Sequence, residues 1–263
     1  MLTVFIAKAW VENRLDVAEH MFAKAERLRQ YLTRDFAEKL ADVLYEIGKS
    51  LYGKGDCAIA VKWLDRANEI INGQELEQLS REGIELRLAV LQSLVTACLG
   101  TGTEEGLVKG RNIVDFLEGE MGNKLVVSLL KLELLQHTPA EVFDGESYAD
   151  VLRHIIRNFN SSESEFRLIM HHIRKLHDKS PRTGGGILDD FIIMLRGPDK
   201  SQWMEKAVIT RIWMITNQRD STGIITAVQG VLGHLSKPLG AEAAVAAQAV
   251  GVKFDLLVGK RKD

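Results

Sequence analysis

The sequence predicts an all-α fold, an α-solenoid of antiparallel helix pairs wound into a right-handed superhelix. Apolar residues recur at helical spacing along most of the chain, and no sustained alternation of apolar and polar residues predicts a strand. The 263 residues include only four prolines, so long helices are seldom interrupted. The spacing of small and large apolar residues also recurs, which indicates stacked structural repeats.

The clearest repeat unit begins at Ala41. The segment Leu44-Tyr45-Glu46-Ile47-Gly48-Lys49-Ser50-Leu51 is followed, after a short turn, by Ala60, Leu64 and Ala67. Read as a helix–turn–helix unit of about 34 residues, this segment has the apolar and small positions of a tetratricopeptide (TPR) repeat. We expect Gly48 and Ala60 where the two helices cross too closely for a larger side chain.

Similar spacings on either side extend the repeat to residues 1–122. The first ten residues predict a helix with one apolar face, formed by Leu2, Phe5, Ile6 and Ala9. The next helix repeats the spacing of Ala60, Leu64 and Ala67 with Ala18, Phe22 and Ala25. A third unit has Leu91, Leu94, Val95 and Cys98, then a turn with Gly102 at the position of Gly55, then Gly110, Val114 and Leu117.

Beyond Gly122 the TPR spacing fades but helical patterning continues, so residues 123–263 are expected to continue the same solenoid. The expected helices are 123–136, 147–159, 162–178, 187–196, 200–218, 221–235 and 239–252. We expect the first to end at Thr138-Pro139, and Asn160-Ser161-Ser162 with Glu165 to form a capping box. Ser180-Pro181 and the triplet Gly184-Gly185-Gly186 are expected in a loop. Trp203 and Trp213 are expected to pack between helices.

Composition excludes several functional classes. A formal net charge of −2 argues against a dedicated nucleic-acid binder, which needs an excess of Lys and Arg. Cys57 and Cys98 lie within helical patterns, outside any metal-binding spacing, as expected in a reducing compartment. The N-terminus lacks the basic start of a signal peptide. No apolar run is expected to reach the roughly 18 to 20 residues that span a bilayer.

No motif predicts catalysis, a cofactor or a metal. His171 and His172 point to different sides of a predicted helix, and His177 is five positions further, so we interpret them as satisfied or solvated side chains rather than metal ligands. The glycine-rich segment 100–106 lacks the Lys-Ser/Thr pair of a phosphate-binding loop and is interpreted as a turn. The acidic pairs Glu104-Glu105 and Asp189-Asp190 are interpreted as charges beside helix starts.

One span is locally basic. Residues 151–182 contain seven Lys or Arg and three Asp or Glu side chains. This excess could bind DNA or an acidic segment of a partner. We interpret it instead as a solvated face of two helices, because no aromatic stacking residues or known binding fold accompany it.

The TPR register predicts a protein-binding surface. In this register the inner helix of the second repeat directs Asp42, Tyr45, Lys49 and Tyr52 to one stripe, distinct from the packing stripe. The third repeat would extend the surface with Gln92, Thr96 and Leu99. Tyrosines beside a lysine suit peptide binding. The alternative is that an upstream repeat or an adjoining helix covers the tyrosines.

An ordered set of segments resembles the meiotic Spo-twenty-two/Zip-four family over roughly residues 10 to 250. These segments are 44–51 with Val61-Lys62-Trp63-Leu64, then 166–181, 205–213, 218–221 and 235–239. The Gly184–Gly186 triplet departs from the helical stretch expected there, and the resemblance ends near Gly251. Members of this family are several times longer, which implies that the chain corresponds to a part or a short version of such a protein.

The resemblance implies a nuclear scaffold on meiotic chromosomes that promotes crossover formation and synaptonemal complex assembly. The implied partners are an XPF-like Zip-two protein with its small companion, and other crossover and chromosome-axis factors. Two alternatives stay open: a general TPR adaptor or co-chaperone-like assembly factor, and a helical hydrolase with a site near His171 and His172. A positioned nucleophile or metal in a convergent pocket would favour the hydrolase.

Overall fold

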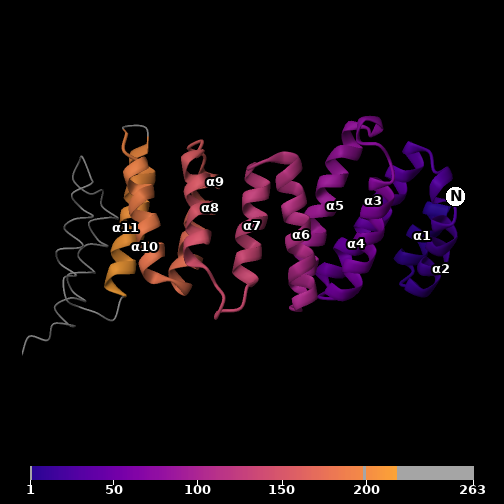
Figure 1. The fold of residues 1–263 in the computed structure, drawn as a ribbon, viewed down its shortest axis with the longest axis horizontal. Helices are drawn as coiled ribbons and strands as arrows, with labels where there is room; N and C mark the ends of the chain where they lie inside the picture. Colours follow the sequence, from indigo (N-terminus) through magenta and orange to yellow (C-terminus); the bar gives the residue numbers. More distant parts are fainter. Residues whose placement is uncertain (1, 198–199, 218–263) are drawn as a thin grey trace, which may run out of the picture. The chain divides into compact units, whose positions relative to one another are not determined.

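The computed structural model describes residues 2–197 and 200–217, and the regular structure within these ranges is helical, as predicted. Figure 1 shows its α-helices following one another along the chain. The chain divides into two compact units, Met1–Thr138 and Pro139–Asp263.

The first unit contains α1 to α7. Their bounds are α1 Leu2–Val11, α2 Leu15–Glu26, α3 Arg34–Gly53, α4 Cys57–Asn72, α5 Arg81–Gly100, α6 Glu104–Met121 and α7 Leu125–His137. Consecutive helices pack together as α1 with α2, α3 with α4, α4 with α5, α5 with α6 and α6 with α7. In addition α1 contacts α3, α3 contacts α5, and α5 contacts α7. The odd-numbered helices are therefore neighbours along the unit.

The α3–α4 crossing is as close as the repeat predicts. A Cβ atom on Gly48 would lie 2.6 Å from Leu64 Cγ and 3.3 Å from the carbonyl oxygen of Ala60. Ala60 and Leu64 are fully buried. The predicted packing role of these three residues is confirmed.

The turns after α3 and α5 are equivalent. Gly55 and Gly102 have φ angles of +89° and +65°, a region that glycine adopts without the steric cost of a side chain. After the second turn, the Thr103 side-chain oxygen accepts a hydrogen bond from the Gly106 amide at 3.1 Å and caps α6. The predicted turn is therefore confirmed at Gly102, while Gly106 already belongs to the helix.

Two clusters of buried apolar side chains meet at α5. The larger extends from α1 to α5 and includes Val90, Leu94 and Cys98 of α5. The smaller joins α5, α6 and α7 and includes Leu91, Val95 and Leu99 of α5, with Val114 and Leu117 of α6. Because α5 packs in both clusters, it is apolar on two faces.

The length and composition of α5 would also allow it to cross a membrane. This differs from the expectation that no apolar run reaches that length. A helix packed inside a domain meets the same criterion, and the two clusters account for the buried apolar side chains of α5.

The second unit, as far as it is described, contains α8 Gly145–Arg157, α9 Glu163–Lys179, α10 Pro181–Met194 and α11 Ser201–Thr216. Consecutive helices pack together, and α8 also contacts α10. These helices agree with those predicted from the sequence within a few residues, except at the start of α10. The expected helices at 221–235 and 239–252 lie outside the described residues.

The start of α10 corrects the expected loop. The helix begins at Pro181, where the missing proline N–H has no helical partner to lose, and it continues through the glycine triplet. A Cβ atom on Gly184 would lie 2.6 Å from the His177 Cα atom, and one on Gly185 would lie 2.9 Å from Arg211 Nη1. These glycines therefore permit close approach to α9 and α11 instead of reversing the chain.

The predicted cap of α9 is confirmed with one difference. Ser162 Oγ accepts a hydrogen bond from the Glu165 amide at 3.2 Å. The Glu165 carboxylate accepts from the Asn160 amide at 2.8 Å, two residues before the cap, where a standard capping box would bond the cap residue itself.

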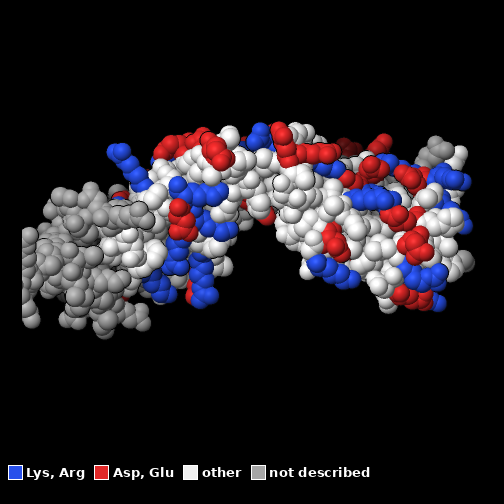
Figure 2. Space-filling view, turned by 90° about the horizontal axis from the view of Figure 1, so that it is seen from below, with Lys and Arg blue, Asp and Glu red and all other residues white. Residues whose placement is uncertain are grey.

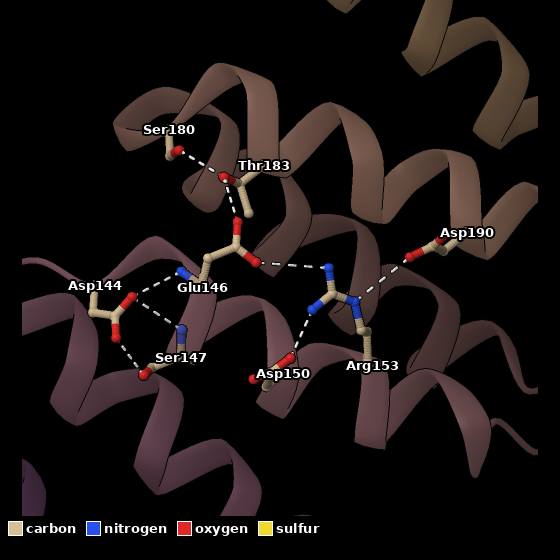
Figure 3. A network of polar contacts seen from close by, with 8 residues as sticks. All are labelled: Asp144, Glu146, Ser147, Asp150, Arg153, Ser180, Thr183 and Asp190. Atoms are coloured by element: carbon tan, nitrogen blue, oxygen red, sulfur yellow. Dashed lines mark hydrogen bonds and ion pairs between the residues drawn. The ribbon is translucent and has the colours of Figure 1, made fainter.

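A polar network joins α8 to α10, as Figure 3 shows. Arg153 lies 2.6 Å from Asp150, 3.6 Å from Asp190 of α10 and 3.8 Å from Glu146. Thr183 of α10 donates a hydrogen bond to Glu146 at 3.2 Å. Asp144 caps α8, because its carboxylate accepts hydrogen bonds from the Glu146 and Ser147 amides. The hydrogen bonds from Ser147 lower the pKa of the Asp144 carboxyl group. The network fixes helix positions and leaves Arg153 surrounded by carboxylates.

Two aromatic residues differ from expectation. Trp203 is buried, with its ring centroid 4.8 Å from that of Phe166, but Trp213 is 52% exposed. The two tryptophans are ten positions apart, so they lie on different sides of α11. In α1, Ile6 and Ala9 are buried as predicted, whereas Phe5 is exposed.

Candidate functional site

The predicted stripe on α3 is a real surface feature. Its residues Asp42, Tyr45, Lys49 and Tyr52 are spaced by three, four and three positions and lie on one side of the helix. Asp42, Lys49 and Tyr52 are exposed and Tyr45 is half-buried. The packing stripe of the same helix, which includes Leu44, Ile47 and Leu51, is buried against neighbouring helices.

A small charge cluster occupies the middle of the stripe. Lys49 Nζ lies 5.4 Å from the centre of the Tyr45 ring and 3.6 Å from a carboxylate oxygen of Glu46. Although Asp42 is exposed as a residue, its carboxyl group is partly desolvated against the helix surface, and this, followed by the nearby charge of Glu46, raises its pKa. The stripe therefore presents aromatic surface together with both signs of charge.

Tyr52 lies where several helices meet. A Cβ atom on Gly100 of α5 would be 3.2 Å from Tyr52 Cε2 and 2.8 Å from Cys57 Sγ at the start of α4. Burial raises the pKa of Tyr52, and the charge of Glu133 on α7 adds to this effect. The side chain is still 39% exposed, so it is held by packing while remaining accessible.

Two of the three predicted residues on α5 lie at the surface. Gln92 and Thr96 are half-buried, and the Thr96 hydroxyl donates a hydrogen bond to the Gln92 carbonyl oxygen at 3.1 Å. Leu99 is only 4% exposed because it packs in the cluster shared with α6 and α7. Leu99 is therefore a core residue and is not part of the exposed surface.

We call Asp42, Tyr45, Lys49, Tyr52, Gln92 and Thr96 the α3–α5 surface. Sequence reasoning missed Glu133, whose charge reaches Tyr52 from α7. A regular repeat would have indicated that α7, the next odd-numbered helix after α5, packs beside α5 and brings Glu133 near Tyr52. This helix position was not predicted, because the TPR spacing fades at Gly122.

The histidines of α9 divide into two kinds. His172 is buried, and its Nδ1 atom lies 2.8 Å from the Tyr148 hydroxyl oxygen of α8. Burial, followed by the charges of His171 and Lys175, lowers the pKa of His172 to about 4. His171 is exposed. Within the described residues, no group of three or more His, Cys, Asp or Glu side chains is arranged to hold a metal ion.

Comparison with known proteins identifies a family. The family model described as "Meiosis protein SPO22/ZIP4 like" matches residues 8–250, which is all but the two ends of the chain. No curated protein and no solved structure matches the chain.

Proposed function

This chain belongs to the SPO22/ZIP4-like family of meiosis proteins, and we propose that it acts in meiosis as a scaffold that holds other proteins together. The scaffold is non-enzymatic in this proposal. It works in the nucleus on meiotic chromosomes, where it promotes crossover formation and synaptonemal complex assembly.

The proposed architecture is a TPR-like right-handed α-solenoid. Its support is the contact pattern of the first unit, where helices pair in sequence and the odd-numbered helices also contact one another. Stacked helix pairs of this kind bury a continuous core and leave an extended surface for binding. In the proposal, the second unit continues the array.

The observation that carries the proposal is the α3–α5 surface. It combines two accessible tyrosines, a lysine and polar side chains on two neighbouring helices, while Leu44, Ile47 and Leu51 of α3 are buried in the core. Tyrosine side chains provide a large contact area at small entropic cost, which is typical of protein-binding sites. The proposed ligands are segments of an XPF-like Zip-two protein with its companion, and of other crossover and chromosome-axis factors.

The proposal is tested with the purified chain and a purified complex of the XPF-like protein and its companion from the same organism. We expect the double variant Tyr45→Ala/Lys49→Ala to bind the complex about tenfold more weakly by calorimetry. The matched control is Tyr31→Ala/Lys24→Ala, which removes the same two residue types from exposed positions in the 3-10 helix Arg29–Tyr31 and in α2. Undiminished binding by a folded Tyr45→Ala/Lys49→Ala variant would exclude the α3–α5 surface.

A further inference from the structure

A groove of about 470 Å³ lies between α9 and α11 in the second unit. Its apolar lining comes from Phe166 and Met170 of α9 and Ile209 of α11. Phe166 and Met170 are each 5% exposed and Ile209 is half-buried, so they form a floor below the surrounding surface. The α9 residues are four positions apart, and the groove follows one face of that helix.

Basic side chains surround this floor. Arg167 and Arg174 of α9 and Lys206 of α11 line the groove and are exposed, as is His171. Among the described residues that line it, none is acidic. Arg167 has a carboxylate partner, Glu163, at 2.5 Å on its own helix. Arg174 and Lys206 therefore provide the positive charge available to a ligand. Figure 2 shows Lys and Arg side chains gathered on the described part of the second unit.

We propose that the α9–α11 groove binds an acidic amphipathic helix of a partner protein. Apolar side chains of that helix contact Phe166, Met170 and Ile209, and its carboxylates pair with Arg174 and Lys206. An amphipathic helix is the occupant that matches an apolar floor with charged edges. A nucleic acid would be held through its phosphates and would leave the apolar floor unused.

The charge of the remaining chain favours a separate partner. Residues 218–263 contain six Lys or Arg side chains and four Asp or Glu side chains, so this segment is not complementary to a basic groove. The inference goes beyond the α3–α5 surface, because the two surfaces share no residue.

The test begins with selection of random peptides of about 16 residues, roughly four helical turns, on the immobilised full chain. The expected sequences have apolar residues at spacings of three and four, and an excess of Asp and Glu. The best peptide is then labelled, and its affinity is measured for the wild-type chain and for Arg174→Glu/Lys206→Glu. We expect this charge reversal to weaken binding by about tenfold, and added salt to weaken wild-type binding.

The matched control is Arg157→Glu/Arg182→Glu, which makes the same change in net charge at two exposed positions outside the groove. We expect the control to bind the peptide as the wild type does. If circular dichroism shows that the reversed variant has lost helix, Arg174→Gln/Lys206→Gln replaces it, since this variant removes the charges without introducing new ones.

Three outcomes would overturn the proposal. The first is a selection that yields no acidic amphipathic sequence. The second is a control variant that weakens binding as much as the groove variant. The third is a labelled DNA duplex that binds more tightly than the peptide and loses its affinity in the groove variant. A failure here leaves the result for Tyr45→Ala/Lys49→Ala unaffected, because that variant changes only the first unit.

Discussion

At the scale of single residues, burial sets the protonation states of Tyr148 and His172, which meet between α8 and α9. Burial raises the pKa of the Tyr148 hydroxyl, so the phenol stays protonated, and its oxygen lies at hydrogen-bond distance, 2.8 Å, from His172 Nδ1. Since burial lowers the pKa of His172 to about 4, this histidine is neutral at pH 7. The pair therefore joins α8 to α9 without a buried charge.

This pair makes the stability of the second unit depend on pH. The folded state binds the His172 proton more weakly than the unfolded chain, whose histidines have a pKa of about 6.5. Stability is therefore lost as the pH falls below about 6.5, and we expect a loss of about 2–3 kcal/mol between pH 7.5 and 4.5. Urea unfolding at both pH values measures it, with His172→Gln as the control. An equal loss in the control would show that other groups cause it.

The glycines of α10 offer a matched pair of substitutions. Gly184→Ala places a Cβ atom against the backbone of His177, which cannot move aside, and we expect a destabilisation of about 1–3 kcal/mol. Gly186 is exposed and no atom lies within 4 Å of its added Cβ. Gly186→Ala is therefore expected to stabilise the helix by about 0.5–1 kcal/mol. Thermal unfolding of both variants measures the difference, and a gain in both would contradict the α9–α10 packing.

Predictions for single residues were wrong where a side chain could lie either at the surface or against another helix. Leu99 continues the spacing of the predicted surface, yet the second core cluster on α5 buries it. Trp213 is apolar and aromatic, yet it faces outward from α11 among the described residues. A helix repeat identifies which positions share a face, but the number of helices packed around that face depends on the whole fold.

At the scale of helices, the α3–α4 crossing is the best-predicted contact. Ala60→Arg would insert a long charged side chain where Gly48, Leu64 and the Ala60 backbone already meet. Overpacking costs about 1–3 kcal/mol, and burying an unpaired charge adds to this.

Ala58→Arg is the control for this substitution, because Ala58 is exposed on the same helix. We expect a clear fall in melting temperature for Ala60→Arg and almost no change for Ala58→Arg. Equal melting temperatures would mean that the α3–α4 register is wrong.

Helix boundaries were predictable wherever caps and turns are local. The side chains of Ser162 and Thr103 cap the helices that follow them, and Gly102 adopts the positive φ angle of the turn. The start of α10 was not predictable in this way, because three glycines ordinarily indicate a loop. The explanation lies in the packing of α10 on α9 and α11: Gly184 approaches the backbone of His177 too closely for a side chain, and Gly185 lies against the guanidinium group of Arg211.

At the scale of the whole molecule, the sequence signal was strongest in the first unit. TPR spacing predicted the helices up to Gly122, but α7 also packs on α5 and α6, and the unit extends to Thr138. Helical patterning was sufficient to predict α8 to α11. The groove between α9 and α11 could not be predicted from the sequence. The basic residues of α9 that line the groove could be recognised in the sequence as a local charge excess. Lys206 is distant from them in the sequence and lies beside them only because α9 and α11 pack together.

For the whole molecule, we propose that the α3–α5 surface binds a partner protein. The most direct measurement is photo-crosslinking with p-benzoylphenylalanine placed at Tyr52 or at Phe116. Both are aromatic and similarly accessible, at 39% and 45% exposed, but Phe116 lies on α6, outside the α3–α5 surface. With the XPF-like protein and its companion as the partner complex, we expect a crosslinked product from Tyr52 and little or none from Phe116. Crosslinking from Phe116 alone, or equally from both positions, would contradict the claim.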